Sequence, residues 1–346
     1  ELYTSEGILV DSTTSGVDGY YELATTQLGW HYIRASCVGY HDYRSALLVP
    51  TVGLDPFLTH PEDKQVLLVV DDDASYYVSM GARENERKQK VKQGDGVWPD
   101  EILVALEGPP EGLTVQRWDE SRQGLPELNV LTYYGVVFWH CGTSWGWAVD
   151  PIDAETLIQY VSGGGRLVLE GEDIGFDHGS DEFMWDVAHA TFAVDYTGAS
   201  GLTVTDTTHP VAQGLPSSFL WNIQPPYDDG VTPANGGEEV IRYTGTSYSA
   251  IVVYDGLANG EGRVVYIAFP LHALSDSIRN QIVYNSVLWS APRSTVTFYT
   301  NPTSFITSPG TVTFAGATYG NGQSYTYWDD DYSATANAPA GYYFVC

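Results

Sequence analysis

Four short runs of uninterrupted apolar residues constrain the fold of this chain more than any other feature. None of them alternates between apolar and polar residues, as a strand with one face in water does. Strands buried on both faces belong to parallel sheets that helices cover on each side. The runs are 66–70, 135–139, 167–169 and 264–268.

A helical stretch directly precedes the third run. Asp153 is suited to cap its N-terminus, residues 153–161 follow the helical period, and three glycines at 163–165 would end it. Strand, helix, glycine-rich stop and strand in succession are typical of a βαβ unit. Residues 64–293 are therefore expected to form an α/β flavodoxin-like domain with a mainly parallel sheet.

The segments on either side of this domain have a different pattern. Short β-branched and aromatic runs, separated by Gly, Asp or Ser, fill residues 1–60 and 294–346. Gly320-Asn321-Gly322 is suited to a hairpin turn. We expect a multidomain chain in which two small all-β modules, both incomplete, flank the α/β domain.

Charge and cysteine usage exclude several classes of function. The formal net charge of −29 argues against nucleic acid as a partner, because phosphate binding needs clustered cations. No apolar run is long enough to span a membrane. Cys37, Cys141 and Cys346 form no C-x-x-C pair, so neither a zinc ribbon nor a c-type haem is indicated.

The central segment resembles the class I glutamine amidotransferase-like superfamily, and in particular its extracellular, non-catalytic branch. The resemblance covers about two-thirds of the chain and implies a secreted, cell-surface location. It rests on motifs that follow the family's order: the strand ending in Asp71-Asp72-Asp73, the strand at 134–142, residues 153–174, His209-Pro210-Val211, and residues 262–270 leading to Leu288-Trp289.

Active members of this family carry a nucleophilic cysteine on a sharp turn after a strand, beside amides that stabilise an oxyanion. The matching turn here is Gly171-Glu172-Asp173, with Glu172 at the position of the thiol. His272 lies near the family's histidine position. Because a carboxylate cannot replace a thiolate in amide transfer, the resemblance implies a degenerate site and no enzyme activity.

Cys141 offers an alternative nucleophile, since it follows His140 directly. Adjacent residues of a strand point to opposite faces, so His140 is poorly placed as its base. We interpret Cys141 as a buried, inert thiol, with a catalytic thiol as the alternative.

Acidic side chains gather where two of the expected strands end. Asp71, Asp72 and Asp73 close one strand, while Glu170, Glu172 and Asp173 close another. The carboxyl ends of strands form the ligand crevice of an open α/β sheet. Oxygen ligands suit Ca²⁺, and the alternative is capping of helices and loop amides. The chain is thus expected to use either no cofactor or Ca²⁺.

The two end segments also resemble known modules. Residues 19–23, 29–36 and Gly39-Tyr40 are similar to a carboxypeptidase regulatory-like (Cna-B-type) β-sandwich. Residues 310–314, Asn321-Gly322 and 338–342 are similar to an internalin B-repeat or PEGA-like module. Together they imply a stalk or filament of extracellular modules.

The leading hypothesis is a non-catalytic structural or adhesive surface protein that self-assembles head to tail by strand exchange between end modules. An intermolecular Cys37–Cys346 disulfide would lock such a polymer in an oxidising setting. Partners would be the chain itself or other surface proteins.

Two alternatives remain open. One is a Ca²⁺-dependent carbohydrate-binding or adhesion module that stacks glycans on tryptophans; the candidates are Trp118, Trp139, Trp145 and Trp147. The other is a hydrolase that uses the acidic cluster.

Overall fold

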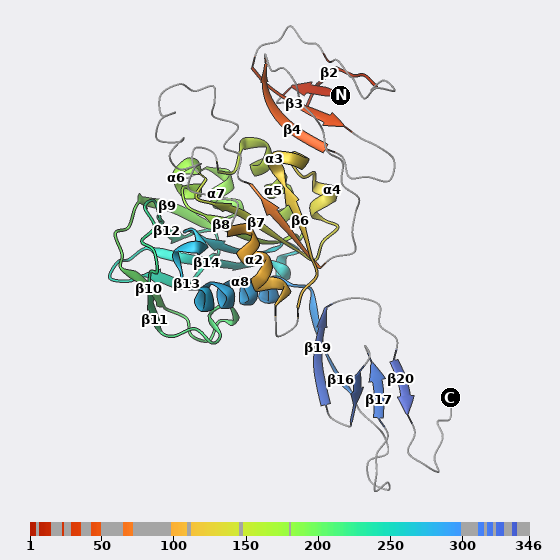
Figure 1. Cartoon of the computed structure of the whole chain (residues 1–346), viewed down its shortest axis with the longest axis vertical. Helices are drawn as coiled ribbons and strands as arrows, with labels where there is room; N and C mark the ends of the chain where they lie inside the picture. The colour runs from red at the N-terminus through yellow and green to blue at the C-terminus, as the bar shows by residue number, and fades with distance from the viewer. Residues whose placement is uncertain are drawn as a thin grey trace, which may run out of the picture. The chain divides into compact units, whose positions relative to one another are not determined.

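The four apolar runs form four adjacent parallel strands in the computed structural model (Figure 1). They are β5 (Val66–Val70), β7 (Val136–Gly142), β8 (Arg166–Gly171) and β15 (Arg263–Ile267). A fifth parallel strand, β6 (Val115–Asp119), lies beside β5. Every residue of β5 and β7 is buried, as expected for strands covered on both faces.

The structure describes most of the central domain and parts of the two end segments. The described residues are 1–4, 7–14, 23, 29–35, 43–49, 65–71, 98–108, 112–144, 148–179, 181–298, 311–314, 317–320, 323–328 and 334–337.

The order of the parallel strands indicates where a ligand would be expected to bind. Across the sheet the strands run β6-β5-β7-β8-β15, which is the order 2-1-3-4-5 of flavodoxin-like sheets. The order reverses between β5 and β7, and ligands of open α/β sheets bind at the carboxyl ends of the strands at such a point. The residues that follow β5 and end β7 therefore occupy the expected position for a site.

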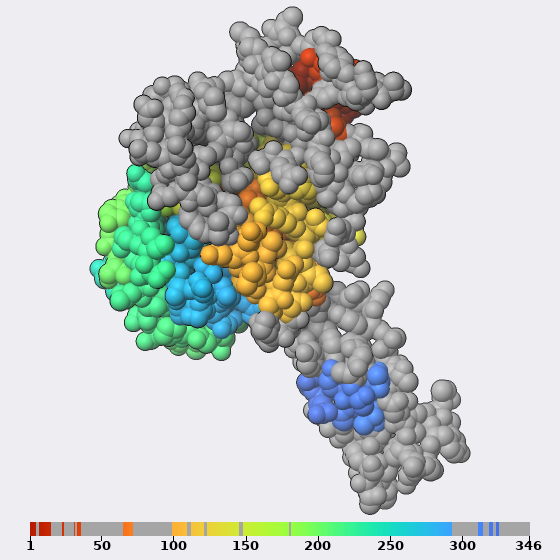
Figure 2. Space-filling view, viewed as in Figure 1, coloured from red at the N-terminus to blue at the C-terminus, as the bar shows by residue number. Residues whose placement is uncertain are grey.

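Two groups of helices cover the two faces of the sheet (Figure 1). The helices α2 (Trp98–Glu107) and α8 (Asp276–Ser290) contact each other, and Figure 2 shows them side by side on the molecular surface. The opposite face carries α5 (Pro151–Ser162), which contacts α4 (Leu128–Leu131) and α7 (Glu182–Asp186). Two more short helices, α3 (Glu120–Gln123) and α6 (Ile174–His178), begin where β6 and β8 end.

The start of α5 corrects one expectation. The N-cap is Asp150, whose carboxylate accepts hydrogen bonds from the N–H groups of Ile152 at 2.6 Å and Asp153 at 3.0 Å. Pro151 supplies the first helical residue, where a missing N–H costs nothing. Asp153, the expected cap, is instead a buried residue of the first turn.

Among the described residues the central sheet is mixed, with eleven strands, and not mainly parallel as the sequence suggested. An antiparallel region joins at β15 through β14 (Ser249–Asp255). Apart from β14, in which residues 249–253 are all buried, its strands contain half-buried or exposed residues, so the continuous burial of β5 and β7 does not mark them. They are β9 (Ala190–Asp195), β10 (Gly201–Val204), β11 (Ser218–Leu220), β12 (Asp229–Pro233) and β13 (Glu238–Tyr243).

Smaller antiparallel sheets occupy the two ends of the chain. The first has the order β2-β1-β3-β4, with β1 (Leu2–Thr4), β2 (Leu9–Asp11), β3 (Gly29–Ala35) and β4 (Tyr43–Val49). The second pairs β16 (Arg293–Phe298) with β19 (Gln323–Trp328). The third has the order β18-β17-β20, with β17 (Thr311–Phe314), β18 (Ala317–Tyr319) and β20 (Ala334–Asn337).

By its internal contacts the chain divides into two compact units, Glu1–Ser290 and Ala291–Cys346. The division into three domains at residues 60, 64 and 293 stays a prediction, as do the sandwich and repeat assignments of the end modules. No helix in the described part of the chain combines the length and apolarity that a membrane crossing requires.

Candidate functional site

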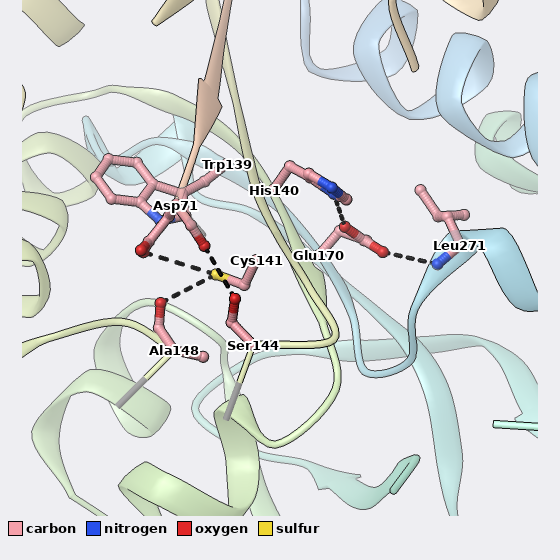
Figure 3. Close-up of polar contacts among 8 residues, drawn as sticks. All are labelled: Asp71, Trp139, His140, Cys141, Ser144, Ala148, Glu170 and Leu271. Carbon is pink, nitrogen blue, oxygen red and sulfur yellow. Dashed lines mark hydrogen bonds and ion pairs between the residues drawn. The ribbon is translucent and has the colours of Figure 1, made fainter. Parts of the chain in front are cut away.

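The switch point between β5 and β7 is built around the carboxylate of Asp71 (Figure 3). The indole N–H of Trp139 donates to Asp71 Oδ2 at 2.8 Å. The thiol of Cys141 lies 3.8 Å from the same oxygen and 3.3 Å from the carbonyl oxygen of Ala148. Trp139 and Cys141 therefore point to the same side of β7, where they help to hold Asp71 in place.

Two further carboxylates from distant parts of the sequence join Asp71. Glu120 follows β6, Asp153 lies in the first turn of α5, and an oxygen of each of the three groups lies within 4.8 Å of the others. All three side chains are buried. We call Asp71, Glu120 and Asp153 the switch-point trio.

Cys141 has the properties of an inert thiol. Burial raises its pKa well above the usual value, and the nearby carboxylates of Asp71 and Glu170 raise it further. A thiol in such surroundings is protonated at neutral pH, whereas the thiolate is the nucleophile. Cys141 is the free cysteine that the described residues contain, while Cys37 and Cys346 lie outside them.

His140 points to the other side of β7, toward Glu170 at the end of β8 (Figure 3). Its Nδ1 forms a short contact with Glu170 Oε2, and Glu170 Oε1 accepts a hydrogen bond of 2.7 Å from the N–H of Leu271. The Glu170 side chain is fully buried. Both of its carboxylate oxygens thus have a structural role, because one contacts β7 and the other accepts a hydrogen bond from the segment after β15.

His272 follows Leu271 and is half-buried. Burial lowers its pKa to about 4; Glu170 opposes this shift, while His140 and Arg279 add to it. The imidazole is therefore neutral at pH 7. A neutral imidazole can accept a proton, but at this site it needs a nucleophile to act on.

The turn between β8 and α6, where the sequence analysis placed the degenerate elbow, has a strained backbone. Asp173 has φ 64° and ψ −2°, a left-handed conformation that costs a residue with a side chain about 1 kcal/mol or more. The preceding Glu172 is fully buried, and its N–H donates to the carbonyl of Gly142 at 2.9 Å. The strained residue of this turn is thus Asp173, one position after Glu172, and the assignment of an elbow to Glu172 stays a prediction. Both residues are carboxylic acids.

Asp173 belongs to a second group of three carboxylates. Asp195, at the end of β9, lies directly opposite Asp229 of β12 in the antiparallel ladder, and α6 contacts both strands. One oxygen from each of Asp173, Asp195 and Asp229 lies within 4.8 Å of the others. We call these residues the elbow trio.

The electrostatics of the elbow trio are unfavourable without a counter-charge. Two carboxylates about 5 Å apart repel by roughly 3 kcal/mol at the effective dielectric of a protein interior. Burial raises the pKa of Asp229 well above its usual value, and the charge of Asp173 raises it further. Burial also raises the pKa of Asp195, and that of the adjacent Asp228 to about 6.

The structure divides the predicted metal ligands between different places. Asp71 belongs to the switch-point trio and Asp173 to the elbow trio, while Glu170 is engaged by His140 and Leu271. Glu172 is buried beside the elbow. Asp72 and Asp73 lie outside the described residues.

Four acidic residues of these trios were not predicted as ligands from the sequence: Glu120, Asp153, Asp195 and Asp229. Glu120 could have been found, because it directly follows Asp119 at the end of β6. Asp195 and Asp229 could not, since only the antiparallel pairing of β9 and β12 brings them to the elbow.

The predicted stacking surface of tryptophans is not supported at two of its positions. Trp118 and Trp139 are buried, and their indole N–H groups donate to Gly124 O and Asp71 Oδ2, both at 2.8 Å. Buried rings that are hydrogen-bonded inside the domain cannot stack on a ligand at the surface. Trp145 and Trp147 lie outside the described residues.

Comparisons with known proteins give structural likenesses only. No protein-family model matches the chain, and no curated protein matches it. A ThuA-like protein from Bacteroides uniformis shares 14% identity, with 70% of this chain and 94% of that one covered and a TM-score of 0.41.

Two further solved structures are similar in the same range. A GMP synthase subunit from Thermoplasma acidophilum shares 11% identity over 66% of this chain and 94% of that one, with a TM-score of 0.41. A β-galactosidase from Bacillus circulans shares 11% identity over 80% of this chain and 41% of that one, with a TM-score of 0.39. At TM-scores below 0.5 these likenesses carry no argument about function, and the fold rests on the strand order described above.

Proposed function

We propose that this chain is a non-catalytic, secreted structural or adhesive protein whose central domain keeps an amidotransferase-like framework without its nucleophile. One observation carries the proposal: the strained residue between β8 and α6 is Asp173. An aspartate at the elbow supplies no thiolate, so the amide-transfer chemistry of that position is lost.

The surrounding residues support a structural role. Glu170 uses both carboxylate oxygens to hold neighbouring segments, and His272 is a neutral imidazole without a thiol at the elbow to deprotonate. The Cys141 thiol is buried and faces carboxylates, which disfavour its thiolate. Each of these polar groups thus serves the fold and not a reaction.

Activity assays test the catalytic half of this proposal. Ammonia release from glutamine and from simple amides should stay at the buffer rate for the wild-type chain and for Cys141→Ala alike. Release by the wild type that Cys141→Ala abolishes would make Cys141 the nucleophile and overturn the proposal.

The proposed assembly rests on strand edges. In the described part of the chain, β2 and β4 form the edges of the first sheet, and β18 and β20 form the edges of the last. Exposed edges carry unpaired N–H and C=O groups that pair with another chain. Head-to-tail pairing of this kind extends into a fibre unless its rotation closes a ring.

Sedimentation velocity and electron microscopy test the assembly. We expect concentration-dependent filaments, and a dimer band on a non-reducing gel that Cys37→Ser or Cys346→Ser removes. A monomer at every concentration would overturn self-assembly and leave adhesion to other surface proteins.

A Ca²⁺-dependent carbohydrate-binding module is the second candidate, favoured by aromatic side chains close to the elbow trio in sequence. Phe176, Tyr196 and Tyr227 are exposed by 53%, 48% and 42%. Exposed aromatic rings beside oxygen ligands suit a sugar ring. Glycan-array binding in Ca²⁺ that EDTA abolishes would favour this candidate over a purely structural role.

A further inference from the structure

The elbow trio carries an inference beyond the proposed function, because a cation site there would exist whether or not the chain is adhesive. Its members come from three elements: Asp173 from the turn after β8, Asp195 from the end of β9, and Asp229 from the start of β12. The β9–β12 ladder and α6 hold the three backbones in place.

The spacing of the oxygens fits a single cation. Ca²⁺ binds carboxylate oxygens at about 2.4 Å, so two ligand oxygens on one ion lie at most about 4.8 Å apart. The three carboxylates each offer an oxygen within 4.8 Å of the other two. Asp195 is exposed, while Asp173 and Asp229 are buried, so an ion could enter from the side of Asp195.

Buried atoms without partners give a second, independent indication of a ligand. Asp229 is fully buried, and its Oδ2 accepts hydrogen bonds from the N–H groups of Gly175 at 2.6 Å and Phe176 at 3.3 Å. Its Oδ1 has no hydrogen-bond partner among the described residues. A buried carboxylate oxygen left without a partner is costly, and native proteins satisfy such groups with an ion, water or ligand.

The hydroxyl of Tyr266 is a second buried polar group to consider beside Asp229. It is fully buried, and among the described residues the backbone of Gly175 approaches it without the geometry of an ordinary hydrogen bond. Asp229 and Asp173 are among the charges that act on it. A water in the coordination shell of an ion would give this hydroxyl the partner that the protein does not supply.

The geometry points to a Ca²⁺ site formed by Asp173, Asp195 and Asp229, at the position where an active amidotransferase-like domain would carry its nucleophile. The ion offsets the mutual repulsion of the three carboxylates and takes Asp229 Oδ1 as a ligand. Water molecules fill the remaining positions, as the six to eight oxygen ligands of Ca²⁺ require.

Asp195→Asn is the decisive variant, because the side chain is exposed and its loss does not open a cavity. Glu182→Gln is the matched control, since Glu182 is an exposed acid at the first residue of α7. Terbium luminescence sensitised by nearby tyrosines, with Ca²⁺ competition, measures affinity in 150 mM salt. We expect saturable binding that Asp195→Asn weakens at least tenfold and Glu182→Gln leaves unchanged.

Thermal unfolding in Ca²⁺ and in EDTA tests whether Asp195 binds an ion or only contributes to the fold. Asp195→Asn removes a repulsive charge, so in EDTA it should unfold at the same temperature as the wild type or higher. In Ca²⁺ the wild type should unfold at the higher temperature, because only its site is complete. Equal Ca²⁺ affinity in wild type and Asp195→Asn, or no saturable binding at all, overturns the site. None of these readouts depends on amidase activity or on filaments.

Discussion

Glu170 Oε1 accepts a hydrogen bond of 2.7 Å from the N–H of Leu271, a residue 101 positions further along the chain. The same carboxylate contacts His140 through its other oxygen. One buried side chain thus joins β8, β7 and the segment that follows β15. In the proposed pseudoenzyme, its task is to hold the strand ends together.

Replacing Glu170 should therefore cost stability. Glu170→Ala leaves the Leu271 N–H and the His140 ring without their buried acceptor, and removing one partner of a buried pair costs about 3–5 kcal/mol. Glu170→Gln keeps an acceptor for Leu271 and should cost about 1–2 kcal/mol. Urea denaturation measures both.

Glu155→Ala, an exposed change on α5, serves as the control for Glu170 and should shift stability by no more than about 0.5 kcal/mol. If Glu170→Ala behaves like this control, the contacts of Glu170 do not stabilise the fold.

The free energy of unfolding should depend on pH because His272 has a lowered pKa in the folded chain. Its pKa is about 4 in the folded chain and near 6.5 when unfolded. Between these values the unfolded chain binds a proton that the folded chain does not, so the free energy of unfolding falls as the pH drops from about 6.5 to about 4. Above pH 7 the residue makes no such contribution.

His272→Gln removes this titration. Relative to its own value at pH 7.5, the variant should lose roughly 2 kcal/mol less stability than the wild type at pH 4.5. Urea midpoints between pH 4.5 and 7.5 provide the comparison. Parallel curves for the two proteins would show that His272 is not held neutral by the fold.

Cys141 should resist modification in the native chain. In a Cys37→Ser/Cys346→Ser background, a thiol reagent at pH 8 should label Cys141 only as fast as the chain opens, because the thiol is buried and its pKa is raised. Labelling in urea should be complete within the mixing time. Rapid native labelling would mean that the thiol is reachable and ionised.

The N-cap of α5 allows the contribution of a single capping side chain to stability to be measured. Asp150→Ala removes the acceptor for the N–H groups of Ile152 and Asp153, and should lower the free energy of unfolding by about 1 kcal/mol. Asp150→Ser keeps a capping oxygen and should recover most of that loss. Equal losses for both variants would assign the effect to burial of Asp150 and not to capping.

The parallel half of the central sheet could be predicted from the sequence because its signal is local. Strands buried on both faces need continuous apolar runs, and β5, β7, β8 and β15 each contain one. The sequence also predicted a turn directly after β8. It predicted that His140 and Cys141 lie on opposite sides of β7, because adjacent residues of a strand alternate between its faces. These features depend on neighbours in the chain.

The antiparallel half and the two trios depend on long-range pairing. No local pattern indicates that Asp195 and Asp229 face each other, because the ladder of β9 and β12 brings them together. The left-handed backbone of Asp173 was likewise not evident from the sequence, because aspartate adopts many other conformations. Trp118 and Trp139 show the same limit, because exposure of an aromatic ring is decided by the final packing.

The pairing of β8 with β15 has a consequence for how the chain is made. β8 ends at Gly171, and its parallel neighbour β15 begins at Arg263. During synthesis from the N-terminus, β8 leaves the ribosome with one side of its backbone unpaired until the intervening segment has been made. Sheets that close late through distant pairings fold slowly and aggregate from exposed edges. A chaperone that binds nascent chains should therefore associate with this protein while residues 172–262 are being translated, and release it once β15 has emerged.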